Sequence, residues 1–248
     1  MEVHHAHHPT HKKKWSEYII EFIMLFTAVT LGFFAENIRE GITEKHKKKE
    51  LLEIVSQDFN KDINQLKFHA DYANQKIKSC NLMIQFLDGD HSKLNQKEYY
   101  HSLKNIKGWW FFNPEEKSRI EAESKGYFYT KENSELADAI LRFNFFKNDY
   151  KVTEGHEEKF IDKFNNQIPF ISDFNIFYSI NHYPDRVAEN LLGIKNIKQE
   201  EIVKTKYIIS EIVFFNDIYL DDIDSMKFYA KKAIDIKPER SANLFLNK

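Results

Sequence analysis

Five histidines lie within eight residues near the start of the chain and could bind a metal ion. Neutral imidazole is a ligand of zinc, nickel and copper, so such a tract suits these ions. A short polar tract supplies no fixed outer layer of hydrogen-bonding partners, so the alternative is a solvated polar head that gains positive charge on protonation. The candidate ligands are His4, His5, His7, His8 and His11, and no cofactor is predicted.

Glu21 is the one charged residue in an apolar run of 18 residues, from Tyr18 to Ala35. An ionisable group inside a membrane helix is a candidate for proton or ion coupling. Glu21 also lies one turn from the start of the run, where its carboxylate could reach the lipid headgroups or the lysines before it. Both interpretations stay open at the level of sequence.

The apolar run predicts a transmembrane helix over residues 18–36, after a His/Lys-rich head over residues 1–17. Eighteen helical residues span roughly 27 Å, which matches the hydrocarbon core of a bilayer. Trp15 and Tyr18 precede it where an aromatic belt is expected. A cleaved signal peptide would need a small residue where Phe33 stands. A core helix of a soluble protein could also contain such a run, whereas an interfacial helix would need a strongly charged face. No second run of this kind follows.

One face of this span carries small residues at helical spacing. Its Ala-x-x-x-Gly pair lets two helix backbones approach closely, so the span is expected to pack against a copy of itself. A second, bulky stripe of Phe22, Phe26, Val29 and Phe33 suits lipid. The predicted packing face consists of Glu21, Leu25, Ala28, Gly32 and Ala35.

Basic residues lie on both sides of the span and set its expected orientation. Lys12, Lys13 and Lys14 lie within six residues of it, whereas only Arg39 is that close on the far side; a lysine cluster over residues 45–49 is more distant. The nearer charges favour a cytoplasmic N-terminus and a C-terminal region on the other side of the membrane, which is the periplasm of a bacterium.

The rest of the chain predicts long helices. Apolar residues recur at alternating spacings of three and four over a heptad helix at residues 42–88, which Asp88-Gly89-Asp90 ends. Residues 91–238 read as further helices, of which the last runs from Lys198 to Ile236, and residues 239–248 as a short tail. We expect an all-α protein in which these helices form an antiparallel bundle, or in which the first also pairs with its own copy.

Prolines and glycines mark the ends of the helices between the two longest ones. Pro114 is expected in the first turn of a helix that ends near Gly126. The next helix is expected to run to Pro169, with a possible break near Gly155.

Four adjacent aromatic residues, Trp109, Trp110, Phe111 and Phe112, stand between Gly108 and Pro114. One interpretation is a plug that covers the end of the bundle. The other is a contact with a ligand or partner, which a deep apolar cavity beside these residues would favour.

Composition and motifs give no sign of an enzyme. The 36 Lys+Arg balance 38 Asp+Glu, and this balance argues against a nucleic-acid-binding chain. Seven glycines provide no phosphate-binding loop, and one cysteine excludes a disulfide framework within the chain. His156-Glu157-Glu158 is followed by Phe160, so it is not the zinc motif H-E-x-x-H.

Two stretches give the chain a family resemblance. The His-rich start followed by YIIEFIMLFTAVTLGFFAENIRE resembles the N-termini of uncharacterised single-pass inner-membrane proteins of Bacteroidota-type bacteria. The stretch SRIEAESKGYFYTKENSELADAILRFNFFKNDY resembles their central pattern, with Gly126, Asn133, Leu136 and Leu141 at matching positions. Ser124-Lys125 replaces the usual Ser-Ser of that pattern.

The resemblance covers residues 4–40 and 118–150. It implies a helical protein of the bacterial inner membrane with a single span, and it supplies no catalytic residue. From the residues themselves we expect a membrane-anchored helical scaffold or assembly protein that works through protein contacts. Its partners would be the lipid bilayer and either its own copies or another membrane protein. The alternatives are a ligand-sensing bundle that signals through a membrane partner and an ion-coupled subunit that uses Glu21.

Overall fold

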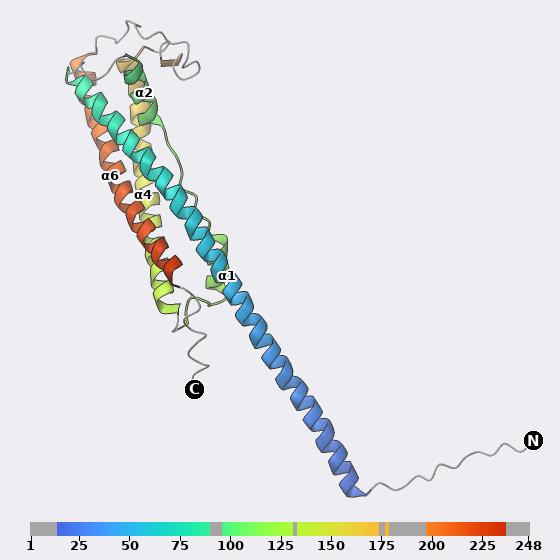
Figure 1. Ribbon diagram of the computed structural model, residues 1–248. Helices are drawn as coiled ribbons and strands as arrows, with labels where there is room; N and C mark the ends of the chain where they lie inside the picture. The colour runs from blue at the N-terminus through green and yellow to red at the C-terminus, as the bar shows by residue number, and fades with distance from the viewer. Residues whose placement is uncertain (1–13, 90–95, 131–132, 174–176, 179–196, 237–248) are drawn as a thin grey trace, which may run out of the picture. The chain divides into compact units, whose positions relative to one another are not determined.

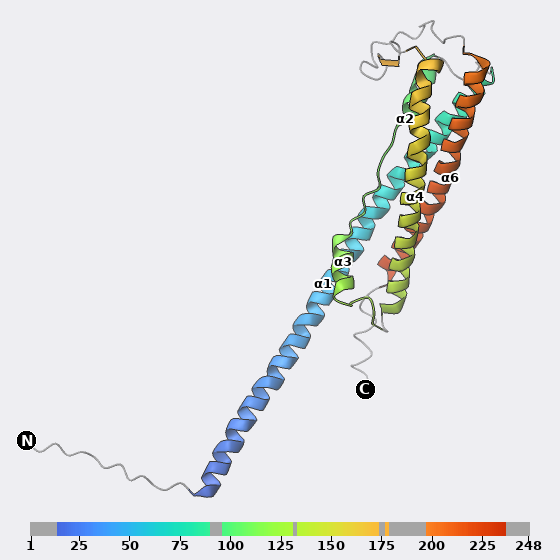
Figure 2. The ribbon, with the colours of Figure 1, turned by 180° about the vertical axis from the view of Figure 1, so that it is seen from behind.

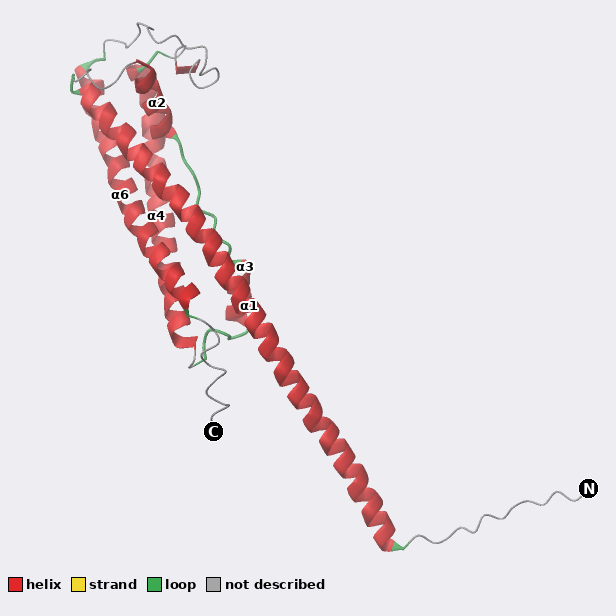
Figure 3. Cartoon of the chain, in the orientation of Figure 1, coloured by secondary structure: helices red, strands yellow, loops and turns green. Residues whose placement is uncertain are grey.

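The computed structural model describes residues 14–89, 96–130, 133–173, 177–178 and 197–236. These residues form helices joined by turns and loops, with no strand among them (Figure 3). The chain divides into two compact units, Met1–Glu50 and Leu51–Lys248. The predicted all-α fold class is confirmed for the described part of the chain.

The first helix, α1 (Trp15–Leu87), has 73 residues and joins the apolar run to the heptad helix without a break. No proline interrupts it, and Gly32 and Gly41 lie inside it. In the first unit, α1 contains an 18-residue window that is long and apolar enough to cross a membrane. None of that window is buried, so its apolar side chains face outward on every side of the helix.

In the second unit, three long helices lie side by side (Figures 1 and 2): α1 from Leu51 onward, α4 (Ser134–Ile171) and α6 (Gln199–Asp235). Helices α4 and α6 run in opposite directions, so Phe146 stacks on Tyr229 at one end and Phe160 contacts Phe215 farther along. The predicted seam of α1 faces the interior. Its buried members are Leu52, Val55, Phe59, Ile63, Leu66, Ala73, Cys80 and Leu87.

Two short helices complete the second unit: α2 (Gln96–Lys107) and α3 (Lys117–Ser124). Gly126 ends α3 in the left-handed region, at φ 70°, as predicted for a glycine in that position. The prediction that Pro114 starts this helix is wrong, since α3 begins at Lys117. The N–H of Glu115 instead donates to the carboxylate of Asp62 on α1, at 2.9 Å.

Helix α4 is more continuous than its sequence indicates. It passes Gly155 without a break and continues two residues beyond Pro169. A proline in the last turn loses only one helical hydrogen bond, so the helix tolerates it there. The N–H of Ser172 closes the end by donating to the carbonyl of Ile168, at 2.9 Å.

The apolar core of the second unit consists of two clusters. The first, at the end of the bundle that α3 covers, includes Leu52, Val55, Phe59, Leu66, Phe112, Ala122, Phe143, Tyr219, Ile223 and Met226. The second, beside α2, includes Cys80, Met83, Phe86, Tyr99, Tyr100, Leu103, Phe164, Ile168, Ile209 and Ile212. The α1, α4 and α6 residues between these clusters are polar, and they form the most unusual site in the bundle.

Candidate functional site

A buried ion pair joins the three long helices between the two apolar clusters. The ammonium of Lys76 on α1 lies 2.7 Å from Oε1 of Glu157 on α4, and their side chains are 2% and 5% exposed. The side-chain amide of Asn216 on α6 donates to the same oxygen at 2.6 Å, and to the carbonyl of Ile212 at 2.8 Å. We call Lys76, Glu157 and Asn216 the polar layer.

The ion pair of the polar layer favours one alignment of the three long helices. Removing a carboxylate and an ammonium from water costs several kcal/mol for each ion, and only close pairing with further hydrogen bonds offsets that cost. Sliding α1 or α4 by a turn, about 5.4 Å, would leave a buried charge without its partner, and sliding α6 would remove the Asn216 donor from Glu157. The layer therefore favours one register of α1, α4 and α6 over shifted registers that would fill the apolar core as well.

A small cavity of about 20 Å³ adjoins the polar layer. Aromatic side chains surround it, among them His69, Tyr150 and Tyr219, and the hydroxyl of Tyr150 lies 3.2 Å from Nδ1 of His69. This volume suits one water molecule, whereas pockets for organic ligands measure about 300–1,000 Å³. The cavity cannot accept an organic ligand without movement of the surrounding helices.

The ionisable groups near the polar layer are shifted toward their neutral forms. Burial lowers the pKa of His69, and burial together with the charge of Glu157 raises the pKa of Tyr72 to about 12. Burial raises the pKa of Glu154 to about 7 and that of Asp222 to about 6. Glu154 Oε1 and Asp222 Oδ2 have no hydrogen-bond partner among the described residues. At neutral pH, His69 is therefore neutral and Glu154 is partly protonated.

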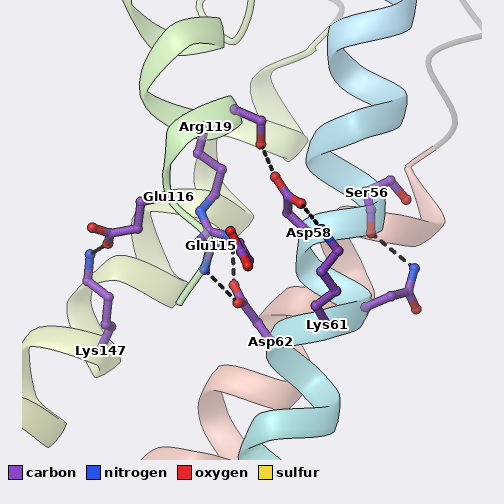
Figure 4. Close-up of polar contacts among 10 residues, drawn as sticks. Ser56, Asp58, Lys61, Asp62, Glu115, Glu116, Arg119 and Lys147 are labelled. Atoms are coloured by element: carbon purple, nitrogen blue, oxygen red, sulfur yellow. Dashed lines mark hydrogen bonds and ion pairs between the residues drawn. The ribbon is translucent and has the colours of Figure 1, made fainter. Parts of the chain in front are cut away.

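A second polar network lies nearer the first cluster and holds α3 against α1 (Figure 4). Arg119 of α3 forms a buried ion pair with Asp62 of α1 at 2.7 Å, and the hydroxyl of Ser118 donates to Asp58 at 2.6 Å. The Arg119 guanidinium also lies 4.6 Å from the ring centroid of Phe59 and 5.2 Å from that of Phe143. A helix of eight residues is too short to be stable alone, so these contacts hold it in place.

The four aromatic residues at 109–112 differ in burial. Phe112 is buried in the first cluster, Trp109 is half-buried beside the second, and Trp110 and Phe111 are exposed. Their segment runs along the side of α1 and does not cross the end of the bundle (Figure 2). The ring centroids of Trp110 and Phe68 of α1 lie 5.2 Å apart. The interpretation as an end plug is therefore wrong, because the short α2 turns the chain back along α1.

Gly108 permits this path along α1. A Cβ at Gly108 would lie 2.0 Å from the hydroxyl of Tyr72, far inside normal contact. With the Tyr72 side chain in its present position, the segment can pass this close to α1 because residue 108 has no side chain.

The other predicted site residues lie apart from the polar layer. Glu21, Leu25, Ala28, Gly32 and Ala35 are all exposed on α1 in the first unit. A Cβ at Gly32 would meet nothing within 4 Å, so nothing in the described chain covers this face. His4, His5, His7, His8 and His11 lie outside the described residues. Within the described ranges, no three His, Cys, Asp or Glu side chains lie close enough to hold a metal ion.

Comparison with protein-family models, with curated protein sequences and with solved structures found no match. Cys80 is fully buried, and burial raises its pKa to about 12, so the thiol is protonated at neutral pH and is a poor nucleophile. The described interior thus has a structural polar layer and, beside it, a cavity that suits one water molecule.

The polar layer has a signal in the sequence that heptad analysis of apolar residues overlooks. Asp62, His69 and Lys76 recur every seven residues along α1, and all three are buried. Polar residues at a heptad spacing beside an apolar seam indicate a second buried stripe on the same helix. The partners of Lys76 have the same kind of signal: Asn216 stands at a seam position of α6, and Glu157 follows the buried Tyr150 of α4 by seven residues.

Proposed function

We propose that the chain is a membrane-anchored helical scaffold that acts through protein contacts. One observation carries the proposal: α1 is a single helix with an apolar, entirely exposed part and a part that belongs to the bundle core. An exposed apolar stretch of this length is stable in contact with lipid and costly in contact with water.

The membrane concerned would be the inner membrane of a bacterium, as the family resemblance implies. The lysines next to the apolar run favour a cytoplasmic N-terminus, with the bundle in the periplasm.

The packing of the bundle favours a scaffold over a ligand sensor. The cavity next to Trp110 suits one water molecule, and the two apolar clusters on either side of it are filled by large side chains. Two buried ionic networks also fix the helix register, which suits a part that must keep its shape. A sensor of an organic ligand would need a larger internal pocket than the cavity beside the polar layer.

Affinity purification from native membranes tests the proposal. The full chain would carry a C-terminal tag, and membrane proteins would be cross-linked before mild detergent extraction. A scaffold would recover additional copies of the chain or another membrane protein in stoichiometric amount. Recovery of monomeric chain alone, under conditions that preserve a known membrane complex, would contradict it. A Trp110→Ala, Phe111→Ala variant serves as a matched comparison for contacts made through the exposed aromatic segment.

A further inference from the structure

Helices α4 and α6 carry contacting aromatic rings along one side of the bundle. Phe146 stacks on Tyr229 with centroids 5.9 Å apart, while Phe160 contacts Phe215 at 5.6 Å and Tyr207 at 6.3 Å. Three more rings, on outer positions, each contact one of these. We call this set the aromatic face: Phe145, Phe146, Phe160, Tyr207, Phe214, Phe215, Phe228 and Tyr229.

Half of the aromatic face points away from the core. Phe145, Tyr207, Phe214 and Phe228 are 57–62% exposed. Each follows a buried core residue by two positions, which is about 200° around a helix. Those buried residues are Phe143, Thr205, Ile212 and Met226. The exposed rings therefore occupy the outer sides of α4 and α6, which no described element of this chain covers.

The aromatic face is large enough to form the centre of an interface. At about 200 Å² for each side chain, the four exposed rings present roughly 500 Å² of apolar surface, and the half-buried rings add to it. A specific interface buries about 800 Å² on each partner, which includes its polar rim. An apolar patch of this size is comparable to the largest patch on a typical monomer, and such a patch often serves as an interaction site.

Charges beside the face are of both signs, which suits a second copy of the same chain. On α4 and α6, Asp138 pairs with Arg142 at 3.8 Å and with Lys232 at 3.4 Å, and Lys163 lies 4.1 Å from the ring of Phe160. A two-fold axis pairs a surface with itself, so a rim that carries both signs can be complementary to its own copy. The net charge of -2 gives little long-range repulsion between copies.

We propose that the aromatic face is the contact between two copies of this chain, which pack face to face about a two-fold axis. The proposal deepens the proposed function, because it names the partner that the scaffold holds. It does not depend on the membrane span, since the face lies entirely on α4 and α6. The span and the face could therefore contribute separately to assembly, and each is tested by its own variants.

Substitution of exposed rings in the full chain tests this interface. We expect the wild-type chain in mild detergent to be a dimer by light scattering coupled to size exclusion. Phe145→Glu with Phe214→Glu should weaken dimerisation by at least roughly 100-fold, because a two-fold contact loses each central aromatic residue twice. Ile120→Glu on α3, which replaces a side chain of similar exposure (60%), is the control and should leave the dimer intact. Circular dichroism checks that all variants are folded.

Single cysteines provide a second measurement in native membranes. Phe145→Cys, Tyr207→Cys, Phe214→Cys and Phe228→Cys, treated with a short bifunctional maleimide, should give a dimer for at least one position, and Ile120→Cys should give none. The native Cys80 is fully buried and does not interfere. Failure of all four positions to cross-link would overturn the inference, as would a dimer that Phe145→Glu with Phe214→Glu leaves unchanged. If Gly32→Leu alone abolishes the dimer, the face is not the contact, although the proposed scaffold function stands.

Discussion

Lys76 on α1 and Glu157 on α4 meet at 2.7 Å in the interior of the bundle, although they stand 81 positions apart in the sequence. Their contact, completed by Asn216 of α6, is the one place in the described bundle where all three long helices share a polar interaction. It divides the apolar core into two clusters. The pair and Asn216 therefore set the register of α1, α4 and α6 along the bundle.

Removal of one member of this pair should be more harmful than removal of both. Lys76→Met leaves the Glu157 carboxylate buried with only Asn216 as its donor, and should lower the free energy of unfolding by about 3–5 kcal/mol. Adding Glu157→Gln should restore most of that loss, because the amide can still accept from Asn216. Urea unfolding followed by the fluorescence of Trp109 and Trp110 measures both effects. Additive losses in the double variant would contradict this account of the pair.

Raising the pH should remove the stabilisation that depends on protonated Glu154 and Asp222. The pKa of Glu154 is raised to about 7 and that of Asp222 to about 6, above their ordinary values, so the folded state binds protons that the unfolded state has already released. The contribution of these groups is complete below about pH 4 and is lost as the pH rises through 6 and 7. Glu154→Gln should flatten the profile and stabilise the protein at pH 8 by about 1–2 kcal/mol, after allowance for partial exposure. Unfolding midpoints from pH 5 to 8 test this, and an unchanged profile in Glu154→Gln would argue against it.

The guanidinium of Arg119 should not be replaceable by an ammonium. Arg119→Lys keeps the charge that pairs with Asp62 but loses the planar group that lies against Phe59 and Phe143, and should cost about 1–2 kcal/mol. Arg119→Met leaves Asp62 buried without its cation and should cost about 3–5 kcal/mol. Thermal unfolding of the two variants gives the ranking. Equal stability of Arg119→Lys and wild type would show that charge alone matters.

Gly108→Ala should destabilise the segment that crosses α1. Its new methyl would collide with the hydroxyl of Tyr72, and the displacement should cost about 1–3 kcal/mol. Tyr72→Phe removes the colliding oxygen, so the double variant should recover part of the lost stability. It also removes the weak hydrogen bond from the Tyr72 hydroxyl to the Asn105 carbonyl, at 3.4 Å. A matched Gly155→Ala on α4, where a Cβ meets nothing within 4 Å, should be neutral or stabilising. Lack of rescue by Tyr72→Phe would exclude the collision as the cause.

The small-residue face of the span should bring copies into contact in the membrane. Ala28→Cys and Gly32→Cys are expected to form disulfide-linked dimers on mild oxidation, because small residues allow close approach of two helices. Phe26→Cys and Phe33→Cys, on the stripe predicted to face lipid, are the matched controls and should cross-link weakly. Dimers that form equally at all four positions would indicate random collision.

The parts of the fold that depend on local pattern can be predicted from the sequence. The seams of α1 and α6, the end of α3 at Gly126 and the all-helical class follow from heptad spacing and from the backbone freedom of glycine. The start of α3 cannot be predicted in this way. The N–H of Glu115 donates a hydrogen bond to the carboxylate of Asp62, which stands 53 residues earlier, and α3 begins only after this contact. Such a contact is tertiary and has no local signal.

The polar layer illustrates the same limit. Lys76 belongs to a heptad-spaced polar stripe of α1, and Glu157 lies seven residues after the buried Tyr150 of α4. The sequence does not show that these two side chains pair with each other, because their contact depends on how α1 and α4 are aligned. The aromatic face is similar, because the Phe and Tyr residues of α4 and α6 divide between core and surface in a way that depends on how the two helices pack.

The central claim is that the apolar part of α1 lies in a membrane, and alkaline carbonate extraction of native membranes tests it most directly. After extraction and ultracentrifugation, the full chain should remain in the pellet together with an integral membrane protein used as a marker. A matched chain with Leu25→Arg and Val29→Arg in the span should move to the supernatant with peripheral proteins. Release of the unmodified chain into the supernatant would contradict the account.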